Sequence, residues 1–275
     1  MGADDPWEVH AGWWQEHFTD GVDPEYEEQI LPIADVQLAG ARRVLDVGCG
    51  AGDVTICLAE RVGPSGTVLG IDMSPTILET ARWRIEQAKL HNVRFIEGDI
   101  ASAPLDGEFD AIVGRCVLFF VPDRVAALRR LRRVLRPGGV MAFQEPGNAT
   151  VPPLAVPASP LLTQVWDWIR AVYERSGADL FMGLRLFNLF RQAGLPAPVM
   201  HLEALAGGGP DWGGYEHMAS LVRILLPRMI EFGIATEAEV AVDSLASRLC
   251  DEMAAHDSAA VTMSLVSAWT RVGTQ

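Results

Sequence analysis

The stretch VLDVGCGAG at residues 44–52 decides the fold, because a short apolar run leads into a loop with glycine at every second position. A helical pattern over Val54–Val62 follows the loop. Gly48, Gly50 and Gly52 permit positive φ and let a ligand approach the backbone, and the first turn of the following helix leaves N–H groups unpaired. The stretch therefore indicates a strand, a loop and a helix that together bind a ligand.

A glycine-rich loop alone is a weak signal, since such a loop can hold NAD, FAD, another nucleotide or nothing. The dinucleotide pattern expects a small third residue at position 53, where this chain has Asp53, and a carboxylate there would repel a pyrophosphate. No Gly-Lys-Ser/Thr follows, which excludes a nucleoside-triphosphate loop. Asp46, at the mouth of the loop, suits a ligand with cationic groups such as an ammonium or a sulfonium.

The chain on either side of the loop alternates between short apolar runs and helical stretches. This alternation is typical of a parallel, doubly wound α/β sheet. The runs expected to form strands are Val44–Val47, Thr67–Ile71, Val93–Glu97, Phe109–Val113 and Val140–Gln144. The helical stretches are Val54–Val62, Thr76–Leu90 and Val125–Leu135, the last closed by the breaker Pro137-Gly138-Gly139.

Beyond Glu145 the pattern is looser, and the proline-rich stretch 146–160 predicts a connector. Helical patterns then cover about 161–175, 178–193, 216–232 and 237–255. Two further segments can form strands, Pro198–Leu205 and Ala260–Val272.

The 275 residues can bury one large core with an accessory part, and their net charge is −14. This balance argues against nucleic-acid binding and against docking on an anionic membrane. Residues 129–133, Arg-Arg-Leu-Arg-Arg, place their arginines on the solvated side of a helix rather than in a nucleic-acid patch. Lys89 is the single lysine, a bias typical of a GC-rich bacterial genome.

The four cysteines have no CxxC spacing, so we expect neither a disulfide framework nor a structural metal. The amino terminus is acidic where a signal peptide would be basic, and no apolar run approaches 18 residues. These observations predict a cytoplasmic protein.

The glycine-rich stretch resembles the first motif of class I S-adenosylmethionine-dependent methyltransferases, and four further matches follow in the family's order. GIDM at residues 70–73 looks like the end of the second strand, where a carboxylate takes the ribose hydroxyls. EGDI at residues 97–100 is similar to the third motif, whose acid meets the adenine amine while the next residue packs on the ring. FDAIV at 109–113 and LRPGG at 135–139 look like strand four and the turn before strand five.

The resemblance implies a Rossmann-like sheet of seven strands: five parallel strands, then the antiparallel pair Pro198–Leu205 and Ala260–Val272, with inserted helices forming a cap. It divides the chain into an amino-terminal helical lid at 1–40, a core binding S-adenosylmethionine at 41–145, and the cap with the last strands at 146–275. The residues it assigns to S-adenosylmethionine are Asp46, Gly48, Cys49, Gly50, Gly52, Asp72, Met73, Asp99, Ile100, Arg115 and Trp14.

Several of these residues also have ordinary structural roles. Asp72 can cap the next helix, Asp99 can be a turn residue, and Cys49 can be a small packed side chain. Arg115, after strand four, can flank the ligand or form a surface ion pair. The joint spacing of the acids favours the ligand, because independent caps need not fall at the ends of three successive strands.

Methyl transfer from a sulfonium mainly requires that the acceptor be positioned and water excluded, and a base is needed only for a poor nucleophile. Glu145, after strand five, can be that base, an anchor or a salt-bridged carboxylate. His217 follows a glycine-rich loop that can act as a lid, and His17 shares a helical face with Trp13 and Trp14. Permanent packing of these tryptophans, or a homodimer interface, stays open as the alternative.

The function expected from the sequence is methylation of a small, apolar or aromatic metabolite of bacterial secondary metabolism. The aromatic side chains of the accessory part can line a pocket for such an acceptor. The alternative is a cyclase on the same fold that binds S-adenosylmethionine without transferring the methyl group. A macromolecular acceptor is disfavoured, because the net charge is acidic and no Asn/Asp-Pro-Pro-Tyr/Phe motif follows strand four.

Overall fold

The computed structural model describes residues 40–147, 155–261 and 263–273. The chain divides into two compact units. Of the described residues, the first contains 40–145, Met182–Leu202 and 266–273. The second contains Pro146–Phe181 and Glu203–Leu265.

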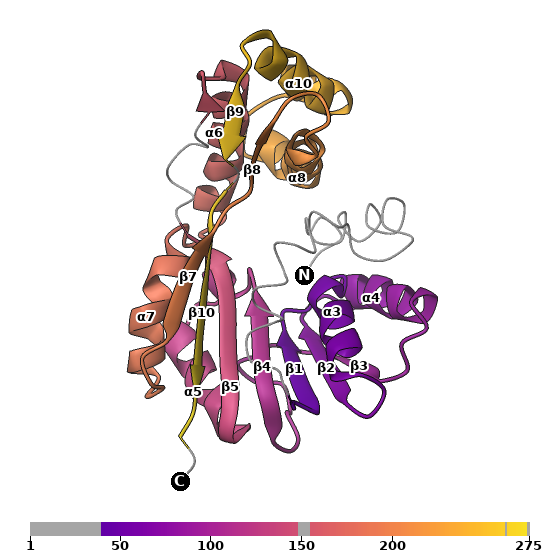
Figure 1. The fold of residues 1–275 in the computed structure, drawn as a ribbon, viewed down its shortest axis with the longest axis vertical. Helices are drawn as coiled ribbons and strands as arrows, with labels where there is room; N and C mark the ends of the chain where they lie inside the picture. Colours follow the sequence, from indigo (N-terminus) through magenta and orange to yellow (C-terminus); the bar gives the residue numbers. More distant parts are fainter. Residues whose placement is uncertain (1–39, 148–154, 262, 274–275) are drawn as a thin grey trace. The chain divides into compact units, whose positions relative to one another are not determined.

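The first unit contains a seven-stranded sheet with the order β3-β2-β1-β4-β5-β10-β7 (Figure 1). The strands β3, β2, β1, β4 and β5 are parallel, in the register Leu45–Leu69 and Leu45–Ile112 at the centre of the sheet. The strand bounds are β1 Arg43–Val47, β2 Thr67–Asp72, β3 Val93–Glu97, β4 Phe109–Arg115, β5 Leu135–Pro146, β7 Val199–Glu203 and β10 Leu265–Arg271.

Strand β10 runs antiparallel to β5, since Val272 bonds to Gly138 and Gly139 while Ser264 bonds to Gly147. Strands β10 and β7 form the antiparallel pair that completes the sheet, although more than fifty residues separate them in the chain. The doubly wound topology expected from the sequence is therefore confirmed, including its antiparallel end.

Two helices of the first unit, α4 and α5, begin at residues whose side chains cap them. The Ser74 hydroxyl accepts the Ile77 N–H at 3.3 Å at the start of α4, and the Asp123 carboxylate accepts the Ala126 N–H at 2.9 Å at the start of α5. The helix bounds are α3 Asp53–Val62, α4 Pro75–Gln87, the 3-10 helix η1 Leu118–Phe120, α5 Arg124–Arg133 and α7 Met182–Gln192.

The second unit consists of helices around a small sheet of order β6-β9-β8. Its core is aromatic and aliphatic, with Trp166, Trp168, Tyr215 and Met218 buried. Its elements are β6 Ala155–Val156, α6 Pro160–Arg175, β8 Ala206–Gly208, α8 Gly214–Glu231, α9 Glu237–Val240, η2 Val242–Ser244, α10 Leu245–Ala255 and β9 Ala259–Val261. No helix in the described part of the chain is long and apolar enough to cross a membrane.

Three boundaries differ from those expected. The segment 260–272 is two strands, because β9 pairs with β6 and β8 in the small sheet while β10 joins the large one. The helix expected over 237–255 breaks at Ala241, whose φ of 43° is left-handed. The breaker at residues 137–139 lies inside β5, because Gly138 and Gly139 continue the ladder with Val272.

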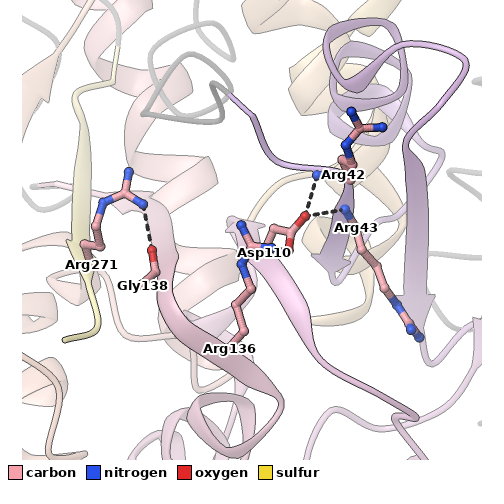
Figure 2. Close-up of polar contacts among 6 residues, drawn as sticks. All are labelled: Arg42, Arg43, Asp110, Arg136, Gly138 and Arg271. Carbon is pink, nitrogen blue, oxygen red and sulfur yellow. Dashed lines mark hydrogen bonds and ion pairs between the residues drawn. The ribbon is translucent and has the colours of Figure 1, made fainter. Parts of the chain in front are cut away.

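Asp110 connects the amino-terminal ends of three neighbouring strands of the large sheet, β1, β4 and β5. Figure 2 shows its carboxylate between the start of β1 and Arg136 of β5. One oxygen accepts the backbone N–H groups of Arg42 and Arg43, at 2.5 and 2.9 Å, and the other forms an ion pair with Arg136 at 2.5 Å. Near the same end of β5, Arg271 of β10 donates to the Gly138 carbonyl at 2.7 Å.

We expect Asp110→Ala to lower the free energy of unfolding by about 2–4 kcal/mol, because two backbone N–H groups lose a charged acceptor in a buried place. Arg136→Ala is the matched control, and since this arginine is 47% exposed its loss should cost less than about 1 kcal/mol. Urea denaturation measures both variants. Equal losses would show that the ion pair, rather than the backbone contacts, is the important part of the cluster.

Candidate functional site

The glycine loop after β1 is bonded to the end of β2. The N–H groups of Gly48 and Cys49 donate to the Ile71 carbonyl at 2.8 and 3.0 Å, and the N–H of Gly50 donates to a carboxylate oxygen of Asp72 at 3.0 Å. The loop thus brings the acidic ends of β1 and β2 together at the carboxyl edge of the sheet, where doubly wound folds bind ligands.

The positions of Gly48 and Gly50 each favour glycine, but for different physical causes. A Cβ on Gly48 would lie 2.4 Å from Cγ2 of Val117, so only a glycine allows this contact. Gly50 has a φ of 51°, and no atom of the described residues lies within 4 Å of the place that a Cβ would take. Among these residues the backbone at Gly50 is uncovered, and its contact with a ligand stays a prediction.

Asp46 is a buried carboxylate at the base of the loop. Its Oδ2 accepts the Thr55 hydroxyl at 2.5 Å, while its Oδ1 is buried without a hydrogen-bond partner. Burial, more than any other cause, raises the pKa of Asp46 to about 7; the bond from Thr55 lowers it, and the carboxylates of Asp72 and Asp53 raise it. A buried, unpartnered carboxylate oxygen can be satisfied by a cationic ligand.

Asp72 does not cap the next helix, because Ser74 does so. Its two oxygens accept the N–H groups of Gly50 and Ser74, each at 3.0 Å, so the half-buried carboxylate is held beside the glycine loop. The side chain of Met73 is 52% exposed.

Asp99 lies in the turn after β3, where its carboxylate accepts the Ala101 N–H at 2.8 Å and its carbonyl accepts those of Ser102 and Ala103. The alternative of a turn residue therefore describes its local bonds. Ile100 is buried.

Asp53 is compensated by a residue that the sequence did not single out. Arg84 of α4 forms an ion pair with it at 2.8 Å and also donates to the Ala51 carbonyl at 2.9 Å. Both side chains are nearly fully buried. Arg84 thus neutralises the charge of Asp53 inside the protein. This weakens the expectation that the Asp53 carboxylate repels a ligand. The only signal for Arg84 in the sequence is an arginine among the apolar positions of a helix.

Of the three roles left open for Glu145 by the sequence, a base, an anchor or a salt-bridged carboxylate, its contacts are those of an anchor. Its fully buried carboxylate accepts the N–H groups of Val117, Leu118 and Phe119 at 3.1, 2.8 and 3.4 Å. Burial raises the pKa of Glu145 to about 7, and the three N–H bonds oppose that shift. The carboxylate thus holds the start of η1, and with it the Val117 side chain that packs on Gly48. This is a positioning role.

Arg115 also bonds inside the sheet. Its Nε donates to Oε1 of Gln144 at 2.8 Å, and Nε2 of Gln144 donates to the Ser267 hydroxyl at 3.1 Å. These contacts link β4, β5 and β10. Cys116, the next residue, has a φ of 51°, an unusual conformation for a non-glycine residue that turns the chain from β4 toward η1.

Of the remaining predicted residues, His217 lies on α8 in the second unit. Tyr215, two residues earlier on the same helix, has a buried hydroxyl without a hydrogen-bond partner among the described residues. His17, Trp14 and their helical lid lie outside the described residues. No group of three or more His, Cys, Asp or Glu side chains in the described ranges is arranged to hold a metal ion.

Comparison with known proteins identifies relatives of this site. A methyltransferase-domain family matches residues 39–177, just over half of the chain. A demethylmenaquinone methyltransferase of Listeria welshimeri is 40% identical over 129 residues, covering 46% of this chain and 54% of that protein. The chain therefore spans about half the length of the curated relatives it matches.

Solved structures share the fold at low sequence identity. A Bacillus halodurans protein assigned as a methyltransferase has a TM-score of 0.59 at 18% identity, covering 90% of this chain and 98% of that one. The [4+2]-cyclase SpnF has a TM-score of 0.50 at 19% identity, covering 91% of this chain and 81% of that one. Likeness at these identities concerns the fold alone.

We expect Glu145→Ala to lower the free energy of unfolding by about 2–4 kcal/mol at neutral pH, because three backbone N–H groups lose their acceptor. Glu145→Gln keeps an oxygen that can accept from Val117 and Leu118, so it should cost clearly less than the alanine variant. Chemical denaturation measures both. If the two variants unfold like the wild type, the carboxylate does not hold η1 and its acid–base role returns as the better explanation.

Proposed function

The chain belongs to the class I S-adenosylmethionine-dependent methyltransferase family, and from this membership we propose that it transfers a methyl group from S-adenosylmethionine to a small, apolar or aromatic acceptor. The observation that carries the proposal is the glycine loop itself. Among the described residues its backbone is uncovered at Gly50, and the carboxylates of Asp46 and Asp72 lie at its base and its side.

These residues fit S-adenosylmethionine better than a dinucleotide. The ligand has a sulfonium and an ammonium, and the unpartnered Oδ1 of Asp46 offers a negative group that would repel a pyrophosphate. Asp53 adds no net charge to this choice, because Arg84 neutralises it. The negative charge that favours a cationic ligand over a pyrophosphate is therefore that of Asp46 and not that of Asp53.

The family resemblance gives the other residues their roles in this proposal. The carboxylate of Asp72 keeps lone pairs for the ribose hydroxyls after accepting two backbone N–H groups. Met73, Asp99 and Ile100 surround the adenine, and Glu145 fixes the chain after β4 through Val117. S-adenosylmethionine supplies an activated methyl group, so these residues need only bind it, align the acceptor and exclude water.

The acceptor is assigned to a chemical class only. In the second unit, whose core is otherwise apolar, three buried polar atoms have no hydrogen-bond partner among the residues that the structure describes: Trp166 Nε1, the Tyr215 hydroxyl and the Ser258 hydroxyl. Polar atoms of this kind suit an apolar or aromatic molecule that carries a few oxygens or nitrogens. We place this acceptor in secondary metabolism of a bacterium, with the protein in the cytoplasm, and the arginine-rich composition supports the bacterial origin.

Two other acceptors or reactions remain as competitors. The demethylmenaquinone methyltransferases point to a quinone, but they match only about half of their own length. The second candidate is a cyclase that binds S-adenosylmethionine without methyl transfer, and the [4+2]-cyclase SpnF has the same fold as this chain.

We expect the purified protein to release S-adenosylhomocysteine when it is supplied with S-adenosylmethionine and a reduced naphthoquinone or a panel of phenolic metabolites. Mass spectrometry should find one added methyl group on the acceptor. The alanine variant of Asp72 is the control and should lose most of this activity. Rearranged product without S-adenosylhomocysteine would support the cyclase instead, and binding of NAD with equal affinity would overturn the ligand assignment.

We expect the affinity for S-adenosylmethionine to rise roughly tenfold between pH 6 and pH 7.5, because Asp46, with a pKa of about 7, becomes negatively charged over this range and the ligand is cationic. In the control Asp46→Asn the affinity should be lower and nearly independent of pH. Isothermal titration calorimetry measures both proteins. Identical pH profiles would show that Asp46 does not face the ligand.

A further inference from the structure

Charge is distributed unevenly over the first unit. Helices α5 and α7 and strand β10 contain no aspartate or glutamate, and strands β5 and β7 contain one acid each, Glu145 and Glu203. They contain nine arginines, although the chain as a whole has a net charge of −14. These arginines are Arg124, Arg129, Arg130, Arg132, Arg133, Arg136, Arg185, Arg191 and Arg271. Arginines therefore outnumber acids nine to two in these five elements, and this part of the sheet with its helices is basic, although Arg136 is paired with Asp110.

Helices α5 and α7 form one continuous layer. Arg129 of α5 donates to the Gln192 carbonyl at the end of α7 at 2.8 Å, and Nη1 of Arg132 lies 2.8 Å from the place that a Cβ on Gly194 would take. On its inner side α7 packs Phe190 edge-on against Phe143 of β5, with ring centroids 6.3 Å apart. The two helices are neighbours in Figure 1 as well.

The outer side of α7 carries large apolar side chains among arginines. Leu184 is 55% exposed and Phe187 is 45% exposed, and with Arg191 they follow the i, i+3, i+7 spacing of one helix face. The inner side is separately apolar, through Met182 and Phe190. The exposed side chains of this layer, which we call the α5–α7 surface, are Arg129, Arg132, Leu184, Arg185, Phe187 and Arg191.

A single exposed apolar side chain is ordinary on a protein surface, whereas adjoining ones with a charged rim mark an interaction surface, and Leu184 and Phe187 adjoin one another on one face of α7. A second copy could cover it through a two-fold contact, but that contact would bring arginine against arginine. An anionic bilayer meets both requirements, since its phosphates accept the guanidinium N–H groups while Leu184 and Phe187 enter the boundary between head groups and acyl chains. We propose that the α5–α7 surface docks on an anionic lipid membrane.

The net charge of the chain does not oppose this docking. Electrostatic interactions across water are screened within about 8 Å at physiological ionic strength, so the membrane senses the charges of the facing surface rather than the total. The expectation against a membrane followed from the total charge, which hides the separation of acidic and basic segments. The proposal does not depend on the reaction, because none of its residues belongs to the glycine loop.

The test is co-flotation of the full chain with vesicles of phosphatidylcholine alone and of phosphatidylcholine with phosphatidylglycerol. We expect binding only to the anionic vesicles, and release in 1 M NaCl, where the screening length falls to about 3 Å. The double variant Leu184→Ser/Phe187→Ser should bind roughly tenfold more weakly, because it loses both apolar contacts with the bilayer. Arg191→Glu should weaken binding to a similar extent by charge reversal.

Ile230→Ser is the matched control, because Ile230 is 49% exposed on α8 and lies outside the α5–α7 surface. It should bind vesicles like the wild type. Thermal unfolding of each variant checks that it is folded, and Arg191→Glu keeps the test decisive if the double variant is not. Absence of vesicle binding, equal binding to both vesicle types, or a dimer in sedimentation that the double variant dissociates would overturn the proposal.

Discussion

The contact between Val117 and the bare Cα of Gly48 joins the two halves of the candidate site. On one side of it, the glycine loop bonds to the end of β2 and brings Asp46 close enough to Asp72 for their charges to interact. On the other side, Glu145 holds the backbone from Val117 to Phe119. A larger residue at position 48 would push the two apart, so the loop, the acids and the chain after β4 all depend on this one close approach.

Glu145 also shows how a buried charge can be used for position instead of chemistry. Water is replaced around its carboxylate by three backbone donors, and these belong to consecutive residues. A carboxylate bonded in this way fixes the direction in which the chain leaves β4. A methyltransferase needs such accuracy more than it needs a proton acceptor, since the methyl group is activated before it reaches the protein.

The sequence was sufficient for the sheet and for the glycine loop, because both follow from local patterns: apolar runs of strand length, and glycines at fixed spacing. It was not sufficient for partners distant in the chain. Nothing local shows that Arg84 neutralises Asp53 across 31 residues, or that Glu145 bonds back to Val117 across 28. The division of 260–272 into two strands was missed for the same reason, since the pairing partners β6 and β8 lie far upstream. His17 and Trp14 lie outside the described residues, and their predicted roles stay predictions.

The place of β10 has a consequence for how the protein is made. It comes last of the large sheet's strands in the chain, yet it lies between β5 and β7 rather than at an edge. During synthesis β7 therefore has no neighbour in this sheet until β10 has emerged, and the β5 ladder remains open on that side. An unpaired edge of this kind is prone to join other chains, so the nascent protein carries this aggregation-prone edge from the synthesis of β5 until β10 has been made.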